Sequence, residues 1–177
     1  MKGNSGKPGN QTLRPGKNGG KNMIGKKDLL IVSNLRKNAR ETLTNMSKAT
    51  HIPISTIYDK MRLHEGGLIR KHTCLLDYNK LGYPTRANVL LRVDKEHREA
   101  LKEYLVKHTN VNSVSKINNN YDFFAEMVFR EIRELEDFLE NLEDRFKIKS
   151  KQVFYVIEDL KREEFLSDPE LLNVIGW

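Results

Sequence analysis

One short stretch of this sequence concentrates side chains that can hydrogen-bond to a nucleic acid. Between Pro53 and Gly66 the chain reads ISTIYDKMRLHE, with polar, aromatic and charged residues interleaved with apolar ones at helical spacing. Arginine can pair with guanine edges, serine and threonine can reach bases or phosphates, and lysine suits phosphate. The residues predicted to present this chemistry are Ser55, Thr56, Tyr58, Asp59 and Arg62, with Lys60 at the flank.

A basic ribbon follows. Gly66 and Gly67 are typical of a helix end, and LIRKHTCLLD reads as a strand or small hairpin. We expect Arg70 and Lys71 in this ribbon to lie near a phosphate backbone. Within the preceding helix, Asp59 would accept from cytosine or orient a neighbouring cation.

Three helical patterns must position these residues. DLLIVSNLRKNA can bury one broad apolar face, and TLTNMSKAT opens with Thr42 or Thr44 as a possible N-cap. Pro53 then breaks the chain, so that a third helix begins near Ile54. Three helices with a tight break before the third, followed by a ribbon, predict a winged helix-turn-helix over residues 28–79. The core-facing residues of the third helix are expected to be Ile54, Ile57 and Met61.

The second half of the chain has a different pattern. Strands are expected in RANVLLRVD, VNSVSKIN, YDFFAEMVFR and KQVFYVIED, and helices in KEHREALKEYLVKHT and EIRELEDFLENLEDRF. The order β-α-β-β-α-β predicts a ferredoxin-like domain over residues 86–160, joined by a linker at 80–85, and therefore an α+β protein. Both helices would cover one sheet face, and the other face is apolar enough to favour a homodimer. The buried stripe of the last helix is expected to comprise Ile132, Leu135, Phe138, Leu139, Leu142 and Phe146.

Charge and glycine are concentrated at the N-terminus. Residues 1–27 hold seven of the 31 lysines and arginines, seven of the eleven glycines and no acid. Such a segment cannot bury enough surface to fold, so we interpret it as a disordered basic arm. It would serve either as a tether that neutralises phosphates or as a solubilising tail.

Composition excludes several classes. No run of 18 apolar residues is present and the N-terminus lacks the apolar core of a signal peptide, which together indicate a cytoplasmic protein with no membrane partner. His64, His72 and the single cysteine, Cys74, do not form a zinc pattern, and Asp122 has no second catalytic group nearby. We therefore predict no enzyme activity, no metal and no cofactor. The C-terminal segment at 161–177 includes SDPELLNVIGW, which is apolar enough to pack on its own domain or on a partner subunit.

The whole string resembles one known family. LRKNARETLTNMSKATHIPISTIYDKMRLHEGGLIRKHTCLLDYNKLGY and INNNYDFFAEMVF are similar to the leucine-responsive regulator/AsnC (Lrp/AsnC, or feast/famine) transcription regulators in their archaeal form, over about residues 28–160. The resemblance implies double-stranded DNA as the partner, dimers that assemble into tetramers or octamers, and a βαββαβ domain that senses an amino acid or other small molecule.

The resemblance also implies an effector loop. Family members carry a Gly-x-x-Asp type loop between the second and third strands of the sensing domain, and asparagine stands here where the glycine is expected. Asparagine tolerates left-handed backbone angles, although its side chain occupies space where bare backbone would approach a ligand. The alternative function is an architectural DNA-coating protein with little sequence preference. The residues assigned to the effector loop are Asn119, Asn120, Tyr121 and Asp122.

Overall fold

The computed structural model describes residues 24–173, which form two compact units. The first contains the residues up to Leu68 together with those from Leu166 onward, and the second spans Ile69–Phe165. Most of the expected basic arm lies outside the described residues, as do Val174, Ile175 and Trp177. No helix within residues 24–173 is long and apolar enough to span a membrane.

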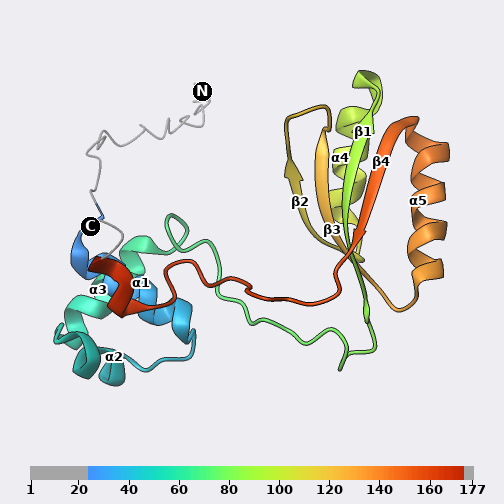
Figure 1. The fold of residues 1–177 in the computed structure, drawn as a ribbon. Coiled ribbons are helices and arrows are strands. Elements are labelled where there is room, and N and C mark those ends of the chain that lie inside the picture. The colour runs from blue at the N-terminus through green and yellow to red at the C-terminus, as the bar shows by residue number, and fades with distance from the viewer. Residues whose placement is uncertain (1–23, 174–177) are drawn as a thin grey trace, which may run out of the picture. The chain divides into compact units, whose positions relative to one another are not determined.

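Three helices make up most of the first unit (Figure 1): α1 (Lys26–Lys37), α2 (Leu43–Thr50) and α3 (Ile54–His64). The start of α1 lies two residues inside the segment expected to be an arm. Thr42 is the N-cap of α2, because its hydroxyl accepts from Asn45 N at 3.1 Å. Pro53 is the residue immediately before α3. Proline disfavours helical backbone at the residue that precedes it, which agrees with the predicted break before this helix.

A small apolar core holds the three helices together. Ile31 of α1, Met46 of α2 and Ile57 of α3 are fully buried and meet in one cluster. Met61 packs against this cluster at its edge. The prediction that Ile54 faces the core is wrong, because its side chain is 45% exposed. Helical side chains tilt toward the helix N-terminus, and Ile54 begins its helix, so it points beyond the core.

The expected wing is shorter than the sequence suggests. Between Glu65 and Asp77 only Glu65 and Ile69 have the backbone of isolated bridge residues, and Gly66 after Glu65 has φ +73°. From Arg70 to Asp77 the chain is exposed and belongs to no helix or strand. A strand requires a partner for its backbone groups, and within residues 24–173 this segment is paired with no strand. The strand or hairpin expected at LIRKHTCLLD is therefore wrong for the single chain.

The end of the chain returns to the first unit. A short 3-10 helix, η2 (Pro169–Asn173), lies against α1, where Leu172 is only 3% exposed (Figure 1). Asp168 starts this turn by accepting from Glu170 N at 2.9 Å. Leu171, the neighbouring apolar residue, is about half exposed. The first unit is therefore built from both ends of the sequence.

The second unit is a four-stranded antiparallel sheet with two helices. Its strand order is β2-β3-β1-β4, and both outer strands pair antiparallel with their neighbours. This arrangement confirms the predicted α+β class and the β-α-β-β-α-β order. The elements are β1 (Thr85–Val93), η1 (Lys95–His97), α4 (Arg98–Lys107), β2 (Val111–Lys116), β3 (Phe123–Phe129), α5 (Ile132–Phe146) and β4 (Ile148–Tyr155).

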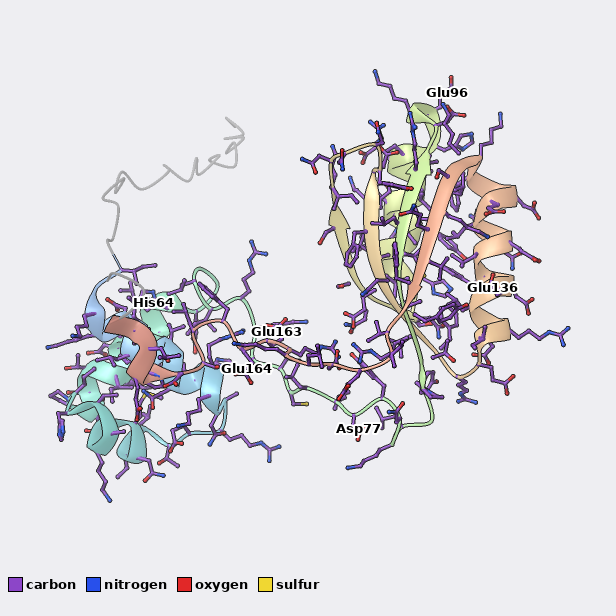
Figure 2. All side chains as sticks on the ribbon, viewed as in Figure 1. His64, Asp77, Glu96, Glu136, Glu163 and Glu164 are labelled. Atoms are coloured by element: carbon purple, nitrogen blue, oxygen red, sulfur yellow. The ribbon has the colours of Figure 1, made fainter. Side chains whose placement is uncertain are left out.

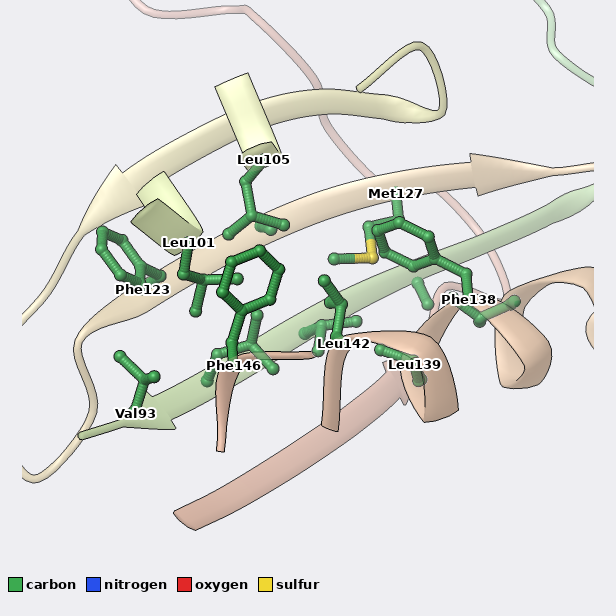
Figure 3. Packing of buried hydrophobic residues seen from close by; sticks show 14 of the residues in the cluster. Val93, Leu101, Leu105, Phe123, Met127, Phe138, Leu139, Leu142 and Phe146 are labelled. Atoms are coloured by element: carbon green, nitrogen blue, oxygen red, sulfur yellow. The ribbon is translucent and has the colours of Figure 1, made fainter. Parts of the chain in front are cut away.

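Both helices pack on one face of this sheet. Figure 3 shows Leu101 and Leu105 of α4 in one apolar cluster with Leu139 and Leu142 of α5 over the strands. Ile132 was expected in the buried stripe of α5, but it is 58% exposed because it is the first residue of the helix, beyond the sheet-facing turns. This expectation is wrong for the same reason as that for Ile54.

The last strand begins earlier than expected. Lys147 adopts a left-handed conformation with φ 50°, so α5 turns directly into β4 at Ile148. β4 ends at Tyr155. The strand expected at KQVFYVIED was therefore placed too far toward the C-terminus. A bulge at Arg92/Val93 adjusts the register between β1 and this early start.

Candidate nucleic-acid interface and ligand loop

The outward side of α3 carries most of the residues expected to contact DNA. Ser55, Tyr58, Asp59 and Arg62 are exposed, and Thr56 is half-buried. The guanidinium carbon of Arg62 lies 6.0 Å from the centre of the Tyr58 ring, so the two side chains form a cation–π pair on the surface. The structure thus brings together five of the eight residues that the sequence assigned to DNA.

Lys60 lies elsewhere on the same helix. Its ammonium donates to Asp28 Oδ1 of α1 at 2.7 Å, and its side chain is only 27% exposed. One turn further along α3, His64 Nε2 donates to the same carboxylate oxygen at 2.8 Å. Lys60 and His64 therefore face α1.

Asp28 is the centre of this cluster, and the sequence reasoning did not identify it. It is 6% exposed, and its second oxygen accepts from Gly25 N at 2.9 Å. Burial acts to raise the pKa of this carboxyl, but the hydrogen bonds from Lys60, His64 and Gly25 outweigh it and lower the pKa to about 2. Its position three residues before Ile31 places Asp28 on the inward face of α1, but this spacing alone does not identify its partners on α3.

Arg70 and Lys71 are exposed on the extended segment that begins the second unit. Of the residues weighed for a zinc site, His64 is bonded to Asp28 within the first unit, and His72 and Cys74 are exposed in the second.

The loop between β2 and β3 is the candidate ligand loop. Asn119 and Asn120 have φ 63° and φ 72°, so both occupy the left-handed region that asparagine tolerates. Ile117 N donates to Asp122 O at 3.1 Å and closes the loop. Both asparagines are exposed and Tyr121 is half-buried, so these three residues are accessible to a solute.

Asp122 has a different position from its neighbours. Its carboxylate accepts from Val93 N at 3.0 Å and pairs with Arg98 at 2.7 Å, and its side chain is 14% exposed. These bonds tie the loop to the end of β1 and the start of α4. Asp122 thus supports the loop, and its acceptor capacity is largely used within the chain.

A groove of about 790 Å³ lies at the opposite end of this unit. Its floor is aromatic, with the ring centres of His108 and Phe138 4.5 Å apart and Tyr104 beside them. Burial lowers the pKa of His108. None of the loop residues lines this groove.

The uncovered face of the sheet carries apolar and charged side chains together. Leu90 pairs with Phe124, and Asn88 pairs with Phe154, which is 53% exposed. At the end of this face Arg86 donates to Asp159 at 2.6 Å and to Glu126 at 3.1 Å.

Comparison with known proteins gives consistent results for the two units. A family described as the Lrp/AsnC ligand binding domain matches residues 86–165. HTH-type transcriptional regulator FL11 of Pyrococcus abyssi is 30% identical over 114 residues, covering 64% of this chain and 76% of that protein. An uncharacterised HTH-type transcriptional regulator of the same organism is 22% identical over 148 residues, covering 83% of this chain and 100% of its own. These relatives are transcriptional regulators rather than enzymes.

Solved structures show the same fold. LrpC of B. subtilis superposes with a TM-score of 0.69 at 19% identity, covering 76% of this chain and 94% of that chain. A transcriptional regulator of Neisseria meningitidis in complex with L-Met superposes with a TM-score of 0.71 at 20% identity, covering 78% and 92%. The likeness extends over both the helical unit and the sheet.

Proposed function

This chain belongs to the Lrp/AsnC family of DNA-binding transcriptional regulators, and we propose that it reads specific duplex sequences through the exposed side of α3. The observation that carries this proposal is the grouping of Ser55, Tyr58, Asp59 and Arg62 on one exposed helical surface. In a helix-turn-helix motif the second helix, here α3, enters the major groove and turns such a surface toward the base edges.

Each side chain has a distinct part in this proposal. Arg62 is the base-reading residue, since its guanidinium can donate two hydrogen bonds to guanine. Ser55 and Thr56, near the start of the helix, reach bases or phosphates, and Tyr58 supports the Arg62 side chain. Asp59 accepts from cytosine or orients a cation. Arg70 and Lys71 contribute phosphate contacts, which add affinity without sequence preference. Lys60 was also predicted to contact DNA, but its bond to Asp28 favours another role.

Two copies would pair through the uncovered sheet face. Leu90, Phe124 and Phe154 on this face are apolar, and the half-exposed Phe154 would be covered by a second copy. A two-fold dimer places two α3 helices on half-sites about one helical turn apart, so the operator is palindromic. Larger assemblies of two or four dimers are consistent with the same unit.

The loop at 117–122 is proposed to take an amino acid. Its exposed Asn119 and Asn120 offer amide donors and acceptors, and Asp122 holds the loop through Val93 and Arg98. A structural neighbour from Neisseria meningitidis was solved with L-Met. Thermal shift measurements with each of the twenty amino acids test this role, and a flat response across the panel would remove it.

Fluorescence anisotropy tests the DNA-reading function. The purified chain is titrated against a duplex from the region upstream of its own gene and against a scrambled duplex, over a series of salt concentrations. A preference of at least about a hundredfold at physiological salt is expected. Equal and steeply salt-dependent binding to both duplexes would instead support an architectural DNA-coating protein, in which the basic residues 1–27 dominate.

A further inference from the structure

A buried ion cluster joins α1 to the helix proposed to read DNA. Asp28 accepts three hydrogen bonds, and two of its donors, Lys60 and His64, lie one turn apart on the same side of α3. Figure 2 shows His64 within the helical unit. The carboxylate is nearly inaccessible to solvent, and each of its oxygens accepts at least one hydrogen bond.

The geometry of α3 relates this cluster to the DNA-reading surface. Successive residues of a helix are separated by about 100° around its axis, so Arg62 stands about 160° from both Lys60 and His64. Tyr58 and Ser55 lie on the same side as Arg62. The hydrogen bonds to Asp28 therefore hold α3 from the side opposite the residues proposed to face the bases.

We propose that Asp28 is a positioning residue for DNA recognition, which fixes the rotation of α3 and keeps the Lys60 ammonium away from DNA phosphates. This inference rests on the proposed function of the α3 surface. Ile57 also anchors α3, but apolar contacts tolerate small rotations, whereas hydrogen bonds to one carboxylate are directional. Loss of the carboxylate has two consequences: the reading surface loses its fixed orientation, and Lys60 becomes a free surface cation.

The two consequences are separable in one experiment on the full chain. Anisotropy titrations over a salt series are run on the upstream and scrambled duplexes for the wild type, Asp28→Asn and Lys60→Met. For Asp28→Asn we expect the preference for the upstream duplex to fall by about tenfold or more. On scrambled DNA its log–log salt slope should steepen by about 0.9, the value for one added phosphate contact.

Lys60→Met distinguishes anchoring from DNA contact. If Lys60 is held by Asp28, the salt slope of this variant stays equal to that of the wild type. A slope flatter by about 0.9 means that Lys60 contacts phosphate and overturns the proposal. Should Asp28→Asn fail to fold, the Lys60→Met slope still shows whether Asp28 keeps Lys60 from DNA phosphate.

Glu65→Gln is the matched control, since it removes the same charge from the same unit at an exposed position. It should reproduce neither effect of Asp28→Asn, and an equal change in slope would show that net charge alone is responsible. If the wild-type chain shows no preference for the upstream duplex, the proposed function is contradicted. The salt slopes on scrambled DNA would still show whether Lys60 contacts DNA phosphate.

Discussion

Acid titration of the first unit should expose the contribution of Asp28 to its stability. The perturbation is Asp28→Asn, which keeps the side-chain shape and removes the charge. The folded pKa is about 2, against an ordinary value of 3.8. A lowered pKa stabilises the fold when the carboxyl is ionised, and at 1.36 kcal/mol per unit the shift corresponds to about 2 kcal/mol at pH 7.

The sign of this effect gives its pH window. The stabilisation is fully present above about pH 4 and is lost as the pH falls toward 2, so that about 1 kcal/mol remains near pH 3. The difference in free energy of unfolding between the wild type and Asp28→Asn should therefore shrink by about half between pH 7 and pH 3.

Urea titrations followed by amide NMR signals can measure this difference in each unit separately. The amides of Ile31 and Ile57 report on the first unit, and those of Val89 and Ala125, in the sheet, are the internal control. A wild-type-to-variant difference that stays constant from pH 7 to pH 3 would refute the reasoning. An equal change at Val89 would show a global effect of acid.

Three further changes test other parts of the structure. Leu172→Ala should destabilise the first unit by about 2–3 kcal/mol in urea unfolding, because its side chain is buried against α1, whereas the half-exposed Leu171→Ala should cost under about 0.5 kcal/mol. Asn120→Val forces a β-branched residue to φ 72° and should cost about 1–2 kcal/mol by thermal unfolding, while Asn118→Val, whose φ is not positive, should be near neutral. Arg62→Ala should lose about 1–3 kcal/mol of preference for the upstream duplex over the scrambled one in anisotropy titrations, and equal losses on both duplexes would remove it as a base reader.

Local signals in the sequence predicted most of the elements. Thr42 and Pro53 each act through their own backbone neighbourhood, so the boundaries of α2 and α3 follow from residue type. The alternation in Phe123, Ala125 and Met127 likewise predicts a strand with one buried face. Such signals need no knowledge of the rest of the chain.

The errors have a common physical origin. Ile54 and Ile132 have the right spacing for a buried face, but each begins its helix, so its side chain lies beyond the packed core and stays about half exposed. The ribbon after Gly67 has strand-like composition, but strand formation depends on a partner that composition does not provide. Asp28 was missed because a single acid on an apolar stripe is meaningful only when its partners, thirty-two and thirty-six residues away, are known.

The return of the chain end to α1 has a consequence for synthesis. During synthesis the three helices of the first unit emerge from the ribosome first, and the whole sheet domain follows. The segment that contains Leu172 emerges only after both. Until that moment the patch of α1 that Leu172 covers is open to other contacts. The helical unit can therefore complete its packing only after the entire sheet domain has emerged.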